Sequence, residues 1–115
     1  MKFNEIGPFD DEKILSVDRR AKLEQLAEEC CELGKACMKL IRAEGNGNPC
    51  SSSFEEAADK VVEEWSDVLV AGEYLMEMLQ PDCRYDISAR VEEIAEGKIK
   101  RWQERVKEAD EKTGN

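Results

Sequence analysis

The stretch that decides the fold is Phe54–Leu79, which reads FEEAADKVVEEWSDVLVAGEYLMEML. Ser53 and Glu56 stand three residues apart at its start, which is the capping-box pattern of a helix N-terminus. The second half, Val68–Leu79, carries only two charged residues, and the rest of its helical circumference is apolar. A helix that is apolar nearly all round is buried nearly all round. We therefore expect a second subunit to help cover this helix.

Two more long helical patterns flank this one and are separated from it by clear breaks. Residues 44–53 are rich in Gly, Asn and Ser and are expected to form a loop, and Gln80-Pro81-Asp82 is expected to interrupt the chain again. A short helix is expected over Asp11–Leu15, within an otherwise irregular head at residues 1–17. No segment alternates with period two, so we predict an all-α fold and a single domain over residues 1–115. The long helices are expected at about Asp18–Arg42, Phe54–Leu79 and about Ile87–Lys112.

Composition and charge exclude several classes of function. The 115 residues include 17 Lys and Arg against 27 Asp and Glu, which gives a net charge of −10. Binding to nucleic acid or to an anionic membrane needs a basic field, so neither partner is expected. Histidine is absent, which removes Ser-His and Cys-His catalytic pairs. There is no apolar leader segment or membrane-length apolar run, and we expect a soluble, cytoplasmic protein.

The five cysteines favour a structural interpretation. Their number is odd and no Cys-x-x-Cys pair occurs, which argues against a zinc ribbon or a redox motif. Cys30 and Cys37 fall on the apolar seam of the first long helix. We therefore expect both to be small buried side chains.

Paired carboxylates are the candidate chemistry. Five Glu-x-x-Glu or Glu-x-x-Asp pairs occur, and most such pairs are solvated helix faces. Glu64 and Asp67, however, interrupt a side of the second long helix that is otherwise apolar, where like charges are costly to desolvate. Glu29 and Glu32 adjoin the seam of the first long helix, so the four can converge if these helices are antiparallel. Oxygen ligands without His select Mg²⁺, or alternatively Mn²⁺; the other interpretation is four surface charges.

A basic strip lies at the edge of the apolar face of the third long helix. Lys98 falls within that apolar face, and Arg101 and Arg105 flank it. One explanation is that their stems cover apolar surface and their charges pair with nearby Glu. The other is a phosphate clamp, with Lys as a point charge and Arg as a bidentate donor. Metal-binding carboxylates together with such a strip suit a polyphosphate substrate.

These motifs together resemble the MazG-type all-α nucleoside triphosphate pyrophosphohydrolases. The superfamily pattern EExxE followed by ExxD is matched by Glu28-Glu29-x-x-Glu32 and Glu64-x-x-Asp67, although the spacer between them is longer here. The resemblance covers about Leu23–Arg105. It is carried by LAEECCELGKA (Leu26–Ala36), EEWSDVLVAG (Glu63–Gly72) and KIKRW (Lys98–Trp102).

The resemblance implies a long-helix bundle whose four-helix core is completed by a homodimer or homotetramer. It also implies hydrolysis of an NTP or dNTP to the monophosphate and pyrophosphate, by water attack at the α-phosphorus, in nucleotide-pool house-cleaning. Mg²⁺ would bind the phosphates and activate that water, one carboxylate would act as general base, and Lys98, Arg101 and Arg105 would hold phosphate. The implied metal ligands and catalytic residues are Glu29, Glu32, Glu64 and Asp67.

Two alternatives remain open at this point. The chain could be a phosphoribosyl-ATP pyrophosphohydrolase on the same fold, or a non-catalytic helical interaction or regulatory module. The residues that would contact the base are not determined, nor is the particular nucleotide. The aromatic candidates for stacking are Phe3, Phe9, Phe54, Trp65, Tyr74 and Trp102.

Overall fold

The structure is a computed structural model that describes residues 6–45 and 52–114. The described residues form helices, turns, bends and irregular segments, and none of them is in a strand, which confirms the all-α prediction. The chain divides into two compact units, residues 1–79 and residues 80–115, and the single-domain expectation stays a prediction. Among the described helices, none combines the length and the apolar character that a membrane span requires. The elements are α1 (Glu12–Leu15), α2 (Arg19–Ala43), α3 (Phe54–Leu79), the 3₁₀ helix η2 (Gln80–Asp82) and α4 (Ile87–Lys112).

Side-chain caps fix the starts of the three long helices. Asp18, Ser53 and Asp86 each accept a hydrogen bond from the backbone N–H three residues on, at 2.9, 3.2 and 3.3 Å. Such caps satisfy donors that the first turn of a helix leaves without a partner. The predicted bounds of α3 and α4 are confirmed. Both predicted ends of α2 are off by one residue, because Asp18 is the cap and the helix continues to Ala43.

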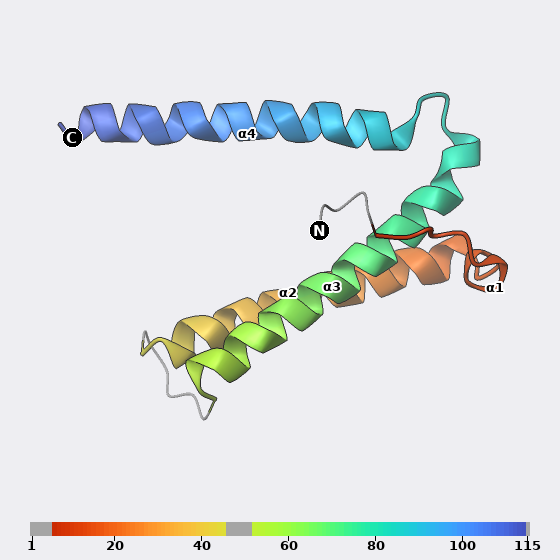
Figure 1. The fold of residues 1–115 in the computed structure, drawn as a ribbon, viewed down its shortest axis with the longest axis horizontal. Helices are drawn as coiled ribbons and strands as arrows, with labels where there is room; N and C mark the ends of the chain where they lie inside the picture. Colours follow the sequence, from red (N-terminus) through yellow and green to blue (C-terminus); the bar gives the residue numbers. More distant parts are fainter. Residues whose placement is uncertain (1–5, 46–51, 115) are drawn as a thin grey trace. The chain divides into compact units, whose positions relative to one another are not determined.

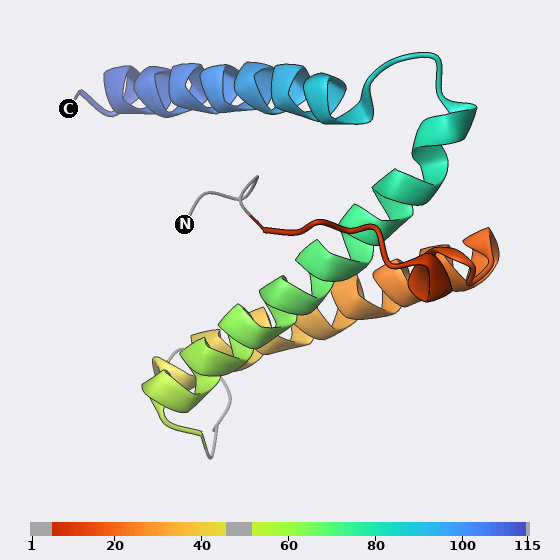
Figure 2. The ribbon, with the colours of Figure 1, turned by 45° about the vertical axis from the view of Figure 1, so that its right-hand side comes forward.

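Helices α2 and α3 run side by side as an antiparallel hairpin (Figures 1 and 2). On each helix, less exposed residues repeat every seven positions along the face toward the other helix, as in a coiled-coil seam. Leu26 on α2 lies 3.9 Å from the point where a Cβ on Gly72 of α3 would stand. On α2 the seam is Lys22, Leu26, Glu29, Leu33, Ala36 and Leu40; on α3 it is Ala57, Val61, Glu64, Val68, Ala71 and Leu75.

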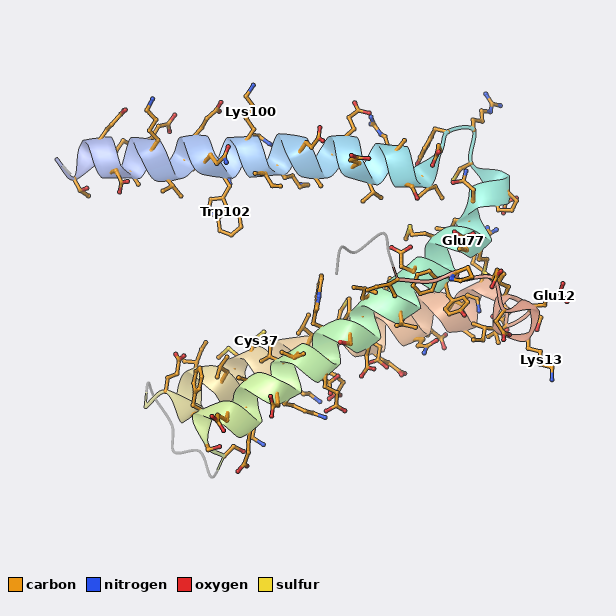
Figure 3. The ribbon with its side chains drawn as sticks, in the orientation of Figure 1. Glu12, Lys13, Cys37, Glu77, Lys100 and Trp102 are labelled. Carbon is orange, nitrogen blue, oxygen red and sulfur yellow. The ribbon has the colours of Figure 1, made fainter. Side chains whose placement is uncertain are left out.

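The position of this seam overturns one prediction. Cys30 and Cys37 are exposed, so the expectation that they are buried is wrong for this chain. The reason is an offset of one residue. The α2 face that meets α3 passes through Glu29 and Ala36, and a rotation of one residue moves both cysteines about 100° away from it. Figure 3 labels Cys37 on α2.

Coverage of the apolar half of α3 also differs from the expectation. Ala71 and Leu75 are buried within the chain itself, at 7% and 3% exposure. Helix α2 covers that side, and the head residue Phe9 packs its ring edge-on against Tyr74 with the ring centroids 5.3 Å apart. The part of α3 expected to need a second subunit is thus partly covered without one.

The second unit consists of η2, a turn and α4. The Gln80 side chain ties the turn to α4, because it donates to the Tyr85 carbonyl and accepts from the Ile87 N–H, both at 2.8 Å. Ile87 is the one buried residue of α4. Lys100 and Trp102 extend from opposite sides of α4, as its amphipathic pattern predicts (Figure 3).

Candidate metal centre

Two carboxylates sit on the seam between α2 and α3 where apolar side chains would be expected. Glu29 takes the seam position between Leu26 and Leu33, and Glu64 takes the position between Val61 and Val68. The antiparallel pairing brings these two positions to the same level of the hairpin. The fold thus holds two negative charges inside its main packing surface.

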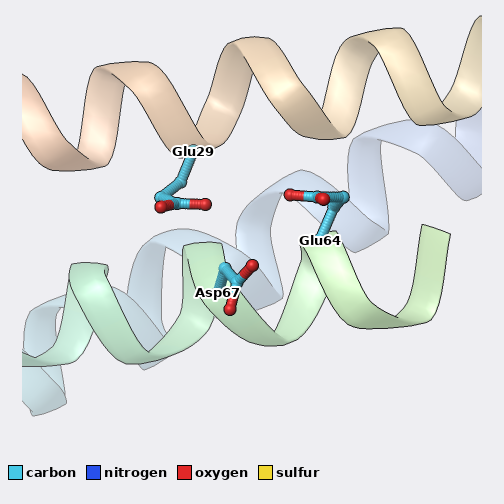
Figure 4. Close-up of side chains that lie close together, drawn as sticks. All are labelled: Glu29, Glu64 and Asp67. Carbon is cyan, nitrogen blue, oxygen red and sulfur yellow. The ribbon is translucent and has the colours of Figure 1, made fainter. Parts of the chain in front are cut away.

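Asp67 completes a group of three carboxylates. Glu29, Glu64 and Asp67 each offer one carboxylate oxygen, and these oxygens all lie within 4.8 Å of one another. Figure 4 shows the three side chains, with Glu29 reaching from α2 toward the two that α3 provides. One helical turn separates Glu64 from Asp67, so a single helix presents both toward Glu29. We refer to these three residues as the acidic cluster.

The acidic cluster runs from the buried seam to the surface. Glu64 is 5% exposed, Glu29 is half-buried and Asp67 is exposed. Burial raises the pKa of the Glu29 carboxyl above its usual value, and the negative charges of Asp67, Glu64, Glu32 and Glu28 raise it further. A cation at this position would relieve that repulsion.

The spacing of the oxygens suits a divalent cation after a small adjustment. Mg²⁺ binds oxygen at about 2.0–2.1 Å in octahedral geometry, so its ligand oxygens stand roughly 3 to 4 Å apart. Oxygens within 4.8 Å of one another can reach that spacing through side-chain rotation. The opening at Asp67 leaves room for the water ligands that Mg²⁺ retains. Glu29, Glu64 and Asp67 are the residues that fit such an ion.

Glu32, the fourth predicted ligand, lies apart from the acidic cluster. Its side chain is about half exposed, and its carboxylate pairs with Lys35 at 3.4 Å on the same helix. Glu32 still acts on the cluster through its charge, since it contributes to the raised pKa of Glu29. The structure therefore brings together three of the four predicted carboxylates.

Lys60 is the residue at this site that the sequence analysis missed. Its ammonium nitrogen lies 2.9 Å from Glu64 Oε1 and 3.5 Å from Glu63 Oε2. The hydrogen bond to Glu64 and the charges of Glu63 and Glu64 raise the pKa of Lys60. The signal that could have revealed it is its spacing, four residues before Glu64 and thus one turn away on the same face.

The predicted phosphate-binding residues belong to the second unit. Lys98, Arg101 and Arg105 are exposed on α4, where together with Trp102 they border a shallow hollow on the helix surface. Trp102 is 72% exposed. The strip therefore offers three cations beside one exposed aromatic ring, which matches the residue types that bind a nucleotide.

The aromatic candidates for base stacking have different surroundings. Phe9 and Tyr74 contact each other, while Phe54 and Trp65 are just over half exposed. Phe3 lies outside the described residues.

Comparisons of this chain with protein-family models, with curated proteins and with solved structures found no match. The geometry of the acidic cluster and the sequence motifs that form it are therefore the features that bear on function.

Proposed function

We propose that this protein is a metal-dependent nucleotide pyrophosphohydrolase that cleaves an NTP or dNTP to the monophosphate and pyrophosphate. The observation that carries the proposal is the convergence of Glu29 from α2 with Glu64 and Asp67 from α3. The same residues belong to the EExxE and ExxD motifs of the sequence. Glu64 lies on the buried seam with two further carboxylates beside it, an arrangement that a bound cation would stabilise.

In this proposal the three carboxylates hold Mg²⁺, or Mn²⁺, and the nearby Glu32 adds negative charge or a water-mediated contact. The bound ion supplies charge neutralisation for phosphate oxygens and a water of lowered pKa. Lys98, Arg101 and Arg105 bind phosphate groups and counter the charge that develops during cleavage. One of the carboxylates accepts a proton from the attacking water.

The proposal includes a homodimer or homotetramer. Supporting it is a second apolar seam on the hairpin, each member of which follows a residue of the first seam by one position. Because α2 and α3 are antiparallel, this offset places both halves of the seam on the same face of the hairpin. Sedimentation at micromolar concentration is expected to give at least a dimer; a stable, active monomer would contradict this part. The large exposed side chains of this second seam are Leu23 and Ile41 on α2 and Val62 and Trp65 on α3.

Pyrophosphate release is the experiment that tests the proposed activity. The purified chain should be assayed against canonical and modified NTPs and dNTPs and against phosphoribosyl-ATP, with Mg²⁺ and with EDTA. We expect Mg²⁺-dependent release from at least one of them. Release from phosphoribosyl-ATP alone would establish that alternative, and no release from any compound would favour a non-catalytic helical module.

A further inference from the structure

The acidic cluster already has a cation beside it, and that cation comes from the protein. Lys60 lies on α3 one turn before Glu64, with its Nζ atom 2.9 Å from Glu64 Oε1. The Glu64 side chain is 7% exposed, whereas the Lys60 side chain is 49% exposed. A charge buried as deeply as Glu64 needs a partner, and Lys60 provides it from the solvent side.

A divalent ion and the Lys60 ammonium group cannot both stay at Glu64 without repulsion. An ion that Glu64 ligates lies about 2 Å from a carboxylate oxygen, and the ammonium nitrogen already lies 2.9 Å from Oε1. Two cations on one carboxylate stand only a few ångströms apart, where their repulsion is strong in a partly buried site. The ammonium group has to move when the ion arrives.

The structure also contains a second acceptor for Lys60. Glu63 Oε2 is 3.5 Å from the same nitrogen, and the Glu63 side chain is 63% exposed. The Lys60 side chain is half exposed and flexible, so rotation about its bonds can move the ammonium group from the buried Glu64 carboxylate to the exposed Glu63 carboxylate. Glu63 thus lowers the cost of releasing Glu64.

We propose that Lys60 is the resident counter-cation of the acidic cluster in the metal-free chain, and that a divalent cation displaces it from Glu64 toward Glu63. Lys60 then sets the affinity of the cluster for metal. This inference rests on the proposed metal centre and goes beyond it, because it assigns a role to a residue that is not a ligand.

Metal binding in the absence of nucleotide tests the inference directly. Free Mn²⁺ should be measured by electron paramagnetic resonance during titration of wild-type chain, Lys60→Met, Lys60→Arg and Glu63→Gln. Lys60→Met keeps most of the stem and removes the competing charge, so it should bind Mn²⁺ about three- to tenfold more tightly, the scale of one partly screened charge pair. Lys60→Arg should bind no more tightly than wild type, and Glu63→Gln should bind more weakly.

Lys107→Met is the matched control. It removes the same charge from an exposed position of α4, outside the hairpin that carries the acidic cluster. A change in net charge alone would tighten Mn²⁺ binding equally in both Met variants, and that result would overturn the role of Lys60. Equal Mn²⁺ affinity in wild type and Lys60→Met would overturn it as well.

Thermal melting separates a merely structural lysine from a counter-cation. In EDTA, Lys60→Met should melt at a lower temperature than wild type, and saturating Mn²⁺ should remove that difference because the ion replaces the lost charge. A deficit that persists in saturating Mn²⁺ would mean that Lys60 only stabilises the helix. If neither wild type nor Lys60→Met binds Mn²⁺, the metal centre itself is wrong, an outcome distinct from the loss of Lys60's role alone.

Discussion

The α2–α3 hairpin and helix α4 carry the same acidic spacing with different results. On α3, Glu64 and Asp67 face Glu29 of α2, and Glu64 is buried. On α4, Glu93 and Glu96 repeat the Glu-x-x-acid spacing, yet both are exposed and Glu93 pairs with Arg90 at 3.3 Å. Two carboxylates at this spacing therefore form a candidate site only where a second helix shields their charges from solvent.

Exchange of single carboxylates should give the largest contrast between the two regions. Glu64→Gln and Asp67→Asn should each lower Mg²⁺-dependent turnover by at least about two decades, because each removes a charged ligand. Asp67→Asn should also raise the melting temperature in EDTA, since the charge of Asp67 is one of those that crowd Glu29.

Glu93→Gln on α4 is the control for these two variants and should keep wild-type turnover. Steady-state kinetics and circular dichroism of all three variants check both statements. Full activity in Glu64→Gln or in Asp67→Asn would remove the proposed metal centre.

Apolar truncation should distinguish the two regions by stability. Leu75 is 3% exposed in the hairpin, so Leu75→Ala should cost about 2–5 kcal/mol in the free energy of unfolding. Ile99 on α4 is 57% exposed, and Ile99→Ala should cost less than about 1 kcal/mol. Urea titration measures both. An equal loss in the two variants would show that the apolar face of α4 is buried in solution, and the contrast between the regions would fail.

Charge removal on α4 tests whether its basic strip binds phosphate. Lys98→Met and Arg101→Met should each lower kcat/KM by about two decades, equivalent to roughly 3 kcal/mol for one charged transition-state contact. Their melting temperatures should stay unchanged or rise, since both residues are exposed. Lys112→Met, near the end of the same helix, is the control. Near-wild-type kcat/KM in both test variants would make the strip a solvated face like the rest of α4.

The smallest effect is expected from a second acidic pair on the hairpin. Burial raises the pKa of Glu73 above its usual value, and the charge of Glu77 raises it further. The pKa of Glu73 is higher in the folded state than in the unfolded state. When the pH is above the folded-state pKa, the ionised carboxylate lowers the free energy of unfolding. This loss disappears as the pH falls below the unfolded-state pKa.

Glu73→Gln should therefore raise the free energy of unfolding at pH 7 by at most about 1 kcal/mol after solvent screening. The melting temperature should rise slightly as a result. The gain should shrink as the pH falls toward 4. Melting curves between pH 4 and pH 7 measure it, with Glu104→Gln on α4 as a control. A gain that does not change with pH would mean that titration of Glu73 is not its cause.

Much of the fold follows from local signals in the sequence. The bounds of α3 and α4 were predicted because each begins after a side-chain cap and ends at a strong break or near the terminus. Which face of α2 meets α3 was not predicted. Two heptad seams one residue apart run along α2, and periodicity alone cannot choose between them.

For the candidate site, the residue types, their spacing and the helices that carry them could be predicted from the sequence. Glu64 and Asp67 were identified because they interrupt a face of the helix that is otherwise apolar, and Glu29 was identified because it adjoins the apolar seam of the first long helix. The packing of α2 against α3 is what buries Glu64, brings it together with Glu29 and Asp67, and leaves the Glu32 side chain about half exposed. Burial and convergence depend on the register of two packed helices, which is a property of the pair, whereas spacing is a property of a single helix.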